Sequence, residues 1–412
     1  MWEMPFRIGQ PGSIPTALVT FAQIKRLSSI LAAVPFVLNS IREIHLVAFD
    51  VPYPANYGGV IDVFYKIKAL HLAGIGIHLH CFSYGRNPDS ELERLCTSVS
   101  YYERSKPANS AFGLLPFIVS SRKNSKLLAR LSEKKIPILF EGLHTCGYIG
   151  HPSIEDQHKV VRMHNIEWQY YRQLARSTQN WFEKFYFLIE SWRIQNFETK
   201  LKHAQCLLGI SQEDYRYLQK KGLPTEYIAP FHQNGKPNAK TGTGRYVLYH
   251  GNLSVSENIL AVTWILRHIN KEFHLVIAGK NPPKNLENSI KNRPNTTLYA
   301  NPDALTLDSL IADAQVNLLP AFQKSGVKLK LINSLYGGRW VLANSAMLFG
   351  TDLRNLVSVF GTADEMNGQL SQLMQRPFTE ADLAKRSVFF FESSIENNCN
   401  LLIKSLFPQN SK

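Results

Sequence analysis

The chain has 412 residues, which exceeds the roughly 250–300 residues at which a single hydrophobic core stops growing, so two domains are expected. Hydrophobic residues make up 44% of the chain and charged residues 19%, a composition that excludes wholesale disorder. The net charge of +14 favours anionic partners. Basic residues are scattered, however, and no nucleic-acid-binding signature occurs, so nucleic acid is not expected among the partners. Five widely spaced cysteines predict free thiols in a reducing compartment.

Residues 1–42 differ from the rest of the chain. Two apolar stretches, 17–24 and 27–38, are separated by Lys25 and Arg26, and neither reaches the roughly 18–20 apolar residues that span a bilayer. No small-residue cleavage site of a signal peptide is present. We expect an N-terminal extension, either an interfacial helix or a segment outside the main fold, on a cytoplasmic protein.

A pattern of alternating strands and helices begins at Glu43. The apolar runs 43–49 and 75–84 flank a helical periodicity that ends at Gly74, and together they predict one βαβ unit. Such units connect right-handedly and indicate a doubly wound parallel sheet. Further strands are predicted at 137–142, 159–164 and 205–211, with two helices across 166–204. We therefore predict an N-terminal Rossmann-like domain over residues 43–228.

Residues 229–244 lose all periodicity and gain Pro, Gly and Lys, which predicts a linker. The pattern then restarts and predicts a C-terminal Rossmann-like domain over residues 245–385. Its strands are expected at 245–251, 273–279, 296–300, 316–322 and 339–344, and its helices at 257–269, 307–314 and 327–336. Residues 386–412 form a C-terminal helix and tail. The closing helices, within 379–406, either cap the second domain or cross back to the first.

This α/β fold class, with two Rossmann-like doubly wound domains facing a cleft, suits a large anionic ligand held between two halves. Gly58 and Gly59 stand where the first strand meets the first helix. Without a Cβ atom the backbone can approach a ligand closely, and a helix N-terminus attracts anions. A tight turn that needs glycine is the alternative explanation.

The sequence HGNLSVSEN, from His250 to Asn258, occupies the corresponding place in the second domain. Gly251 ends the strand there, and Asn252 offers hydrogen bonds to phosphate or sugar oxygens. An ordinary capped loop would have the same composition.

The sequence SGVKLKLINSLYGG, from Ser325 to Gly338, places Lys328 and Lys330 in the first turn of a helix. A cation opposes the helix dipole there by about 0.3–1 kcal/mol, whereas a bound anion would reverse the sign. We interpret both lysines as diphosphate ligands; a solvated basic turn is the alternative.

His164 is predicted at the carboxyl end of a strand, where an imidazole can hydrogen-bond a sugar hydroxyl or the transition state. A structural histidine is the alternative. No D-x-D pair and no His/Cys cluster with metal spacing occurs, so no metal ion is expected. Lysines, arginines and helix termini would then neutralise a leaving diphosphate.

Taken together, these segments resemble the GT-B glycosyltransferases of family four, which transfer sugars with retention. The resemblance covers residues 43 to about 400. The stretch from Asp50 to Gly74, with Gly58 and Gly59, resembles the family's acceptor-side opening. RMHNIE resembles the segment with the active-site histidine, here His164. LYHGNLSVSEN, VIAGKNP and SGVKLKLINSLYGGRWVLAN resemble the donor-side segments in the expected order.

The chain also departs from the family pattern. The usual Arg and Lys of the first donor loop are replaced by Asn252 and Glu257, and the usual pair of glutamates by Ser325 and Asn333. Donor phosphate binding would then fall on Lys328 and Lys330, while Asn333 contacts a ribose or sugar hydroxyl without a charge.

The resemblance implies a hexosyltransferase that uses a nucleotide-diphosphate sugar as co-substrate and has no further cofactor. The acceptor would be a glycan or a lipid-linked molecule, in cell-envelope polysaccharide synthesis. The basic charge and the N-terminal apolar segment are compatible with peripheral contact with an anionic membrane at its inner face. The alternatives are a sugar-nucleotide epimerase or phosphorylase on the same fold, and a non-catalytic nucleotide-sugar-binding protein.

Overall fold

The computed structural model describes residues 42–55, 58–105, 113–178, 180–232, 235–323, 329–351, 353–391 and 394–408. Residues 1–42 and 43–412 are two separate units. The interfacial helix considered for residues 1–42 therefore lies outside the described residues, apart from Arg42. None of the helices in the described part of the chain has both the length and the apolarity that crossing a bilayer requires.

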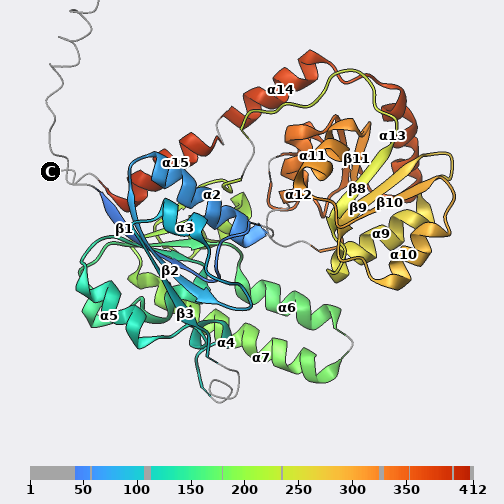
Figure 1. Ribbon diagram of the computed structural model, residues 1–412. Coiled ribbons are helices and arrows are strands. Elements are labelled where there is room, and N and C mark those ends of the chain that lie inside the picture. Colours follow the sequence, from blue (N-terminus) through green and yellow to red (C-terminus); the bar gives the residue numbers. More distant parts are fainter. Residues whose placement is uncertain are drawn as a thin grey trace, which may run out of the picture. The chain divides into compact units, whose positions relative to one another are not determined.

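The first lobe is built on a seven-stranded parallel sheet with the strand order β3-β2-β1-β4-β5-β6-β7 (Figure 1). Most positions of the central strands are buried on both faces, as their continuous apolar runs predicted. The strands are β1 Glu43–Ala48, β2 Gly76–Ser83, β3 Ser98–Glu103, β4 Ile138–Glu141, β5 Lys159–Met163, β6 Cys206–Gly209 and β7 Thr225–Tyr227.

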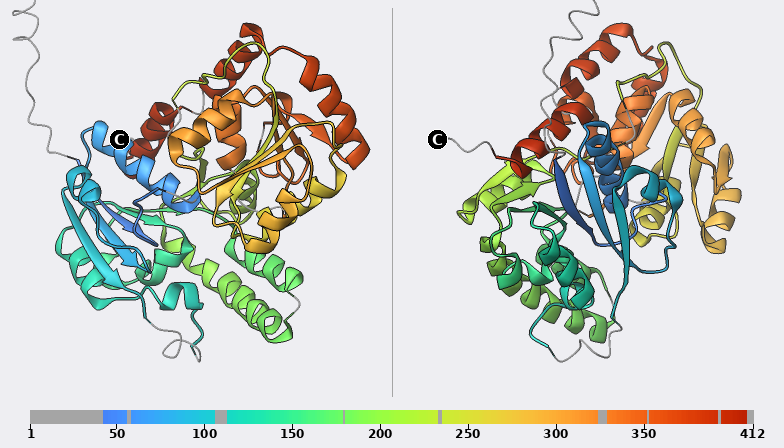
Figure 2. Two further views of the ribbon diagram at one scale, coloured as in Figure 1. Left: turned by 45° about the vertical axis from the view of Figure 1, so that its right-hand side comes forward. Right: turned by 60° about the vertical axis from the view of Figure 1, so that its left-hand side comes forward.

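Helices cover both faces of this sheet, as Figure 2 shows from two sides. One face packs against α2 and α3 through a cluster that includes Val63, Ile67 and Leu92, and the other packs through Leu127, Leu131 and Ile194. The helices are α2 Gly58–Leu72, α3 Ser90–Leu95, α4 Phe117–Ser120, α5 Ser125–Glu133, α6 Glu167–Ser177, α7 Trp181–Phe197 and α8 Gln212–Lys220.

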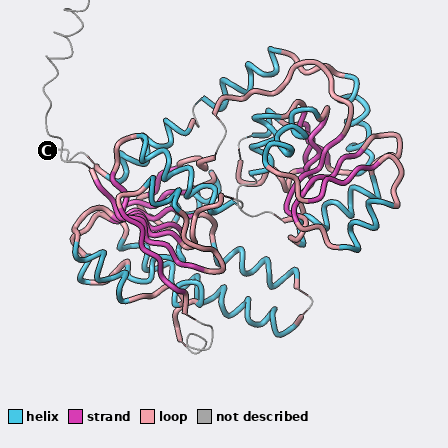
Figure 3. The backbone as a smooth tube through the Cα atoms, in the orientation of Figure 1, coloured by secondary structure: helices cyan, strands magenta, loops and turns pink. Residues whose placement is uncertain are grey.

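The second lobe repeats the plan with a six-stranded parallel sheet in the order β10-β9-β8-β11-β12-β13 (Figure 3). Its strands are β8 Val247–Asn252, β9 Leu275–Lys280, β10 Thr296–Ala300, β11 Val316–Leu319, β12 Trp340–Asn344 and β13 Ser358–Phe360. Its helices are α9 Ser256–His268, α10 Lys284–Lys291, α11 Ala304–Asp313, α12 Leu329–Gly337 and α13 Ala363–Gln375. In each sheet the order in which successive strands are added reverses once, between β1 and β4 in the first and between β8 and β11 in the second. Doubly wound folds bind their ligands at such switch points.

The two closing helices belong to different lobes. From α14, Glu380–Phe391, the Arg386 guanidinium donates to the carbonyl oxygens of Leu335 (3.0 Å) and Gly338 (2.6 Å) at the end of α12. From α15, Ile395–Leu406, apolar side chains enter the core of the first lobe beside α2. The sequence left two alternatives open for the closing helices, and each helix follows one of them.

The predicted strands and helices are confirmed with shifts of up to about three residues at their ends. The prediction omitted three short edge strands, β3, β7 and β13, and included the fourth edge strand, β10. The sequence of β3, SVSYYE, combines two serines and two tyrosines with a single aliphatic residue instead of forming a continuous apolar run. β3 pairs only with β2. The apolar-run criterion therefore detected every central strand and missed most of the edge strands.

Candidate active site

His164 follows directly after β5, and it lies where the sequence predicted it, at the carboxyl ends of the central strands. It is only 9% exposed. The ring of Phe49, the first residue after β1, stands edge-on to the imidazole with 5.2 Å between the ring centroids. The His164 side chain is therefore fixed at the switch point of the first sheet.

A buried carboxylate orients His164. Its Nε2 lies 2.9 Å from Glu141 Oε2, at the end of β4. The same carboxylate accepts hydrogen bonds from Lys66 Nζ at 2.7 and 2.9 Å. Burial alone would raise the pKa of Glu141, but the attraction of Lys66 and the hydrogen bond from His164 lower it below its usual value. Glu141 is therefore ionised and holds His164 Nε2–H as a donor.

Asp62 completes this buried charge network. Its carboxylate accepts from Lys66 Nζ (2.9 Å), from Arg162 Nη2 (3.1 Å) and from the backbone N–H of Phe231 (2.8 Å). Burial by itself opposes ionisation, yet Arg162 and then Lys66 hold the pKa of Asp62 far below its usual range. Arg162 also donates to the carbonyl oxygen of Ile228 at 2.6 Å. The network thus fastens the chain that leaves the first lobe to the strand that carries His164.

Asp62, Glu141 and His164 place ligand atoms within 4.8 Å of one another, the separation of a three-ligand metal centre. In this protein Lys66 Nζ hydrogen-bonds both Asp62 and Glu141, and Arg162 hydrogen-bonds Asp62. A metal ion would have to stand beside two resident positive charges. The donor set fits an internal ion-pair network better than a metal site.

Two further titratable side chains, Glu167 and His144, lie close to His164. Glu167, at the start of α6, is buried, and burial raises its pKa to about 7. His144 Nδ1 lies 4.0 Å from Glu167 Oε1 and has no hydrogen-bond partner among the described residues. Burial, followed by the positive charge of Arg122, holds the pKa of His144 well below its usual value. His144 is therefore neutral, and its buried Nδ1 is left without a hydrogen-bond partner among the described residues.

Sequence reasoning missed Asp62, Lys66, Glu141, Arg162 and His144. A signal was present for four of them. Asp62 and Lys66 stand four residues apart within a helix that is otherwise apolar on that face. Charged residues inside a buried run are paired or functional. Applied to the predicted strands, that rule would also have selected Glu141 and Arg162.

The two predicted glycines at the start of α2 have different roles. A Cβ at Gly59 would lie 2.6 Å from Phe49 Cζ, so this glycine makes room for the ring that contacts His164. A Cβ at Gly58 would meet only Leu329 Cδ1, at 3.8 Å. Leu329 is the first residue of α12, so the N-termini of α2 and α12 lie next to each other. Both helix termini carry partial positive charge.

In the second lobe the structure brings Gly251, Asn252 and Lys330 together through Asn258. Lys330 Nζ lies 2.6 Å from Asn258 Oδ1, and Asn258 Nδ2 donates to the carbonyl oxygen of Asn252 at 2.8 Å. The ammonium also lies 5.1 Å from the centre of the Tyr249 ring. The predicted lysine of α12 and the predicted residues Gly251 and Asn252 at the end of β8 therefore form one cluster at the switch point.

The remaining predicted donor-site residues are Asn252, Asn333 and Lys328. Asn252 Oδ1 accepts from Ser254 N–H at 3.1 Å, so part of its side chain shapes its own turn. Asn333 is half-buried on α12, three residues after Lys330. Lys328 lies outside the described residues, and its assignment stays a prediction.

A buried histidine secures α12 against β8. His250 Nε2 lies 2.9 Å from Ser334 Oγ, and burial, followed by the charge of Lys330, lowers the pKa of His250 to about 3. The imidazole is therefore neutral at physiological pH, and it links the strand before the glycine turn to the helix that carries Lys330.

A cavity between other described residues lies away from the predicted site residues. It has a volume of about 370 Å³ and is lined by Tyr227, His232, Ile332, Phe390 and Asn398, among others. A second cavity of about 170 Å³ begins directly after His164, at Asn165 and Ile166. None of the predicted site residues lines either cavity.

No protein-family profile matches the chain. An uncharacterised 44.6 kDa protein in the cps region of Klebsiella pneumoniae is 24% identical over 330 residues, which cover 75% of this chain and 84% of that protein. The fold is similar to solved structures with much lower identity. TarM of S. aureus, in a mutant complex with fondaparinux, α-GlcNAc-glycerol and UDP, has a TM-score of 0.60 at 9% identity and covers 89% of this chain and 99% of its own.

Two further structures give the same result. A UDP-forming α,α-trehalose-phosphate synthase from Burkholderia vietnamiensis has a TM-score of 0.55 at 9% identity, over 89% of this chain and 99% of its own. HepE of Anabaena, in complex with UDP and glucose, has a TM-score of 0.54 at 11% identity, over 89% of this chain and 95% of its own. The chain therefore has the GT-B fold, which confirms the predicted fold class.

Proposed function

We propose that the chain is a retaining glycosyltransferase that moves a hexose from a nucleoside-diphosphate sugar, with UDP as the first nucleotide to test. The observation that carries the proposal is the cluster of Lys330 and the Gly251 turn at the switch point of the second sheet. It combines an ammonium group with the N-terminus of α9, and both favour a phosphate. The UDP complexes of structures with the same fold support this choice.

In the proposed reaction the bond between the anomeric carbon and the diphosphate oxygen breaks, and the acceptor oxygen bonds to the same face of that carbon. The departing diphosphate oxygen takes the acceptor proton. Lys330, together with Lys328, offsets the negative charge that develops on the diphosphate. His164, held by Glu141, orients the donor sugar.

We propose a glycan or lipid-linked acceptor in cell-envelope polysaccharide synthesis, at the cytoplasmic face of a membrane. The support is the relative in the cps region of K. pneumoniae and the net charge of +14. The structure of TarM with fondaparinux, α-GlcNAc-glycerol and UDP supports the choice of a saccharide acceptor.

Thermal shift with nucleotides tests the donor site. We expect UDP to raise the melting temperature of the wild type, because a ligand that binds only the folded state stabilises it. Lys330→Met should weaken UDP binding about tenfold or more, since a charge-assisted hydrogen bond contributes about 1.5–3 kcal/mol. The matched control is Lys291→Met, which removes an exposed lysine from α10 of the same lobe. Equal affinity of both variants for UDP would refute the donor site.

The replacement of the family's second glutamate by Asn333 favours one other candidate, a protein that binds nucleotide sugars without transferring them. The two candidates differ in turnover. A transferase releases UDP from a UDP-sugar when a lipid-linked oligosaccharide fraction is added and not before. UDP-sugar binding without release, across a panel of donors and acceptor fractions, would decide for the non-catalytic candidate.

A further inference from the structure

Helix α7 is apolar on both of its sides. Ile194 and Phe197 face the core of the first lobe, and Glu190 lies buried on the same side. On the opposite side, Trp181, Phe185, Leu188 and Trp192 recur at intervals of four, three and four residues, which places them in one narrow stripe along the helix. These four side chains are 67%, 64%, 44% and 57% exposed. We call them the α7 stripe.

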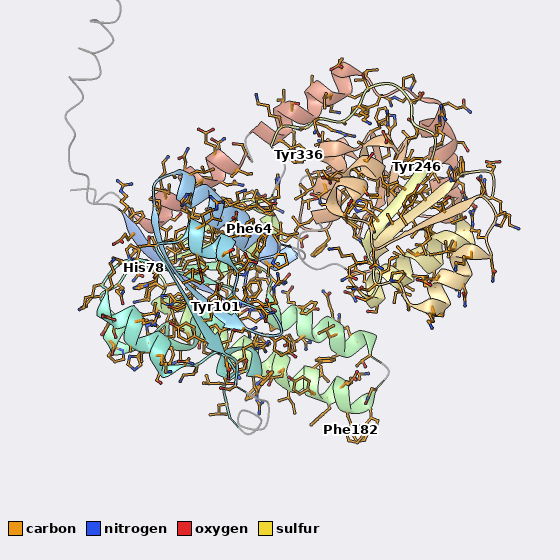
Figure 4. The ribbon with its side chains drawn as sticks, in the orientation of Figure 1. Phe64, His78, Tyr101, Phe182, Tyr246 and Tyr336 are labelled. Carbon is orange, nitrogen blue, oxygen red and sulfur yellow. The ribbon has the colours of Figure 1, made fainter. Side chains whose placement is uncertain are left out.

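The stripe continues at the free end of the α6–α7 hairpin. Phe182 is 66% exposed, and Figure 4 shows it at the tip of α7, pointing away from the lobe. Its ring stacks on Trp181 with 3.6 Å between centroids. Scattered exposed apolar residues are ordinary, but a contiguous patch marks an interaction surface, and a helix that is apolar all round is normally covered all round.

The charges around the stripe are mostly positive. Arg172 and Arg176 of α6 and Lys184 of α7 are exposed, whereas the exposed acidic residue, Glu183, accepts a hydrogen bond from Thr178 Oγ1 at 2.7 Å. Exposed Trp and Phe beside Lys and Arg are the composition of helices that lie in the interface of an anionic bilayer.

We propose that the α7 stripe, with the exposed basic side chains beside it, forms a docking face for an anionic phospholipid bilayer. The aromatic side chains enter the headgroup boundary, and the basic side chains contact lipid phosphates. This docking does not depend on the proposed transfer, because no residue of the stripe belongs to the candidate active site. It assigns the membrane contact to the first lobe, independently of residues 1–42.

Co-sedimentation with vesicles of phosphatidylcholine and phosphatidylglycerol tests the proposal on the full chain. We expect the wild type to sediment with these vesicles, and Phe185→Ser combined with Trp192→Ser to lower the partition coefficient at least tenfold. The matched control is Leu305→Ser combined with Val388→Ser, which removes two exposed apolar side chains from the second lobe. Replacing Arg172 and Lys184 by Glu should weaken binding to the anionic vesicles and leave binding to pure phosphatidylcholine unchanged.

A second measurement covers the case in which the double variant does not fold. Doxyl-labelled lipid should quench the fluorescence of the wild type, and Trp192→Phe should remove part of that quenching. Wild-type binding by the stripe variant, or quenching that is indifferent to Trp192→Phe, would overturn the proposal. Sedimentation velocity provides one more test. If the wild type is a dimer and the stripe variant is a monomer, the stripe binds a second copy of the chain, and the proposal is wrong. Lys330→Met should bind vesicles like the wild type, which separates this outcome from a failure of the proposed transfer.

Discussion

Glu167 ionises at an unusual pH because it is buried. Its pKa in the folded chain is about 7, raised mainly by burial from an ordinary value of 4.5, whereas the unfolded chain exposes it to water. Between these two values the folded state keeps a proton that the unfolded state loses. Folding stability contributed by this residue therefore falls as the pH rises from 4.5 to 7.

Glu167→Gln should remove this dependence, because glutamine has a similar shape and never ionises. We expect the variant to gain on the order of 1–3 kcal/mol of stability relative to the wild type at pH 8, and less at pH 5. Urea unfolding at both pH values measures the difference. An equal effect of the substitution at pH 5 and pH 8 would show that Glu167 ionises normally.

At the scale of an element, the start of α2 shows that neighbouring glycines need not be equivalent. Alanine at an exposed helix position is usually more stable than glycine by about 0.5–1 kcal/mol. At Gly59 the new Cβ would approach Phe49 Cζ to 2.6 Å, and overpacking of this kind costs about 1–3 kcal/mol. At Gly58 the nearest atom, of Leu329, is at an ordinary 3.8 Å.

Gly59→Ala should therefore destabilise the chain and lower transfer, since the displaced Phe49 ring no longer packs on His164. Gly58→Ala is the control, and its stability should equal that of the wild type or exceed it by up to about 1 kcal/mol. Urea unfolding and the kcat/KM of both variants provide the comparison. If Phe49→Leu fails to recover stability in the Gly59→Ala background, the clash with the ring is not the cause.

The central strands were predictable because a strand that is buried on both faces has a continuous run of apolar residues, as in β1 and β9. His164 was predictable because it follows such a run. Its partners were not, since Glu141 and Lys66 lie 75 residues apart in the sequence and meet only after the sheet and α2 have packed. Lys330 was predicted from helix periodicity, whereas its contact with Asn258 depends on the order of β8 and β11.

At the scale of the whole molecule, the repeated pattern predicted two doubly wound lobes but not the lobe to which the last helix belongs. An amphipathic helix shows which of its faces is buried, and its periodicity carries no information about the partner. In the structure, Leu402 and Cys399 of α15 join the core around Ile44 and Ile67 in the first lobe. His158 Nε2 also lies 2.7 Å from the carbonyl oxygen of Ser405. Helix α15 is thus part of the first lobe.

This arrangement predicts a long-range effect of Leu402→Ala. The side chain is fully buried, so we expect a loss of about 2–5 kcal/mol of stability, as for other buried leucines. Hydrogen exchange should rise in β1 and β2 more than in β8 and β9, although residue 402 follows the second sheet in the sequence. Leu401→Ala, at the neighbouring exposed position, should change little in either region. Protection lost first from β8 and β9 would instead assign α15 to the second lobe.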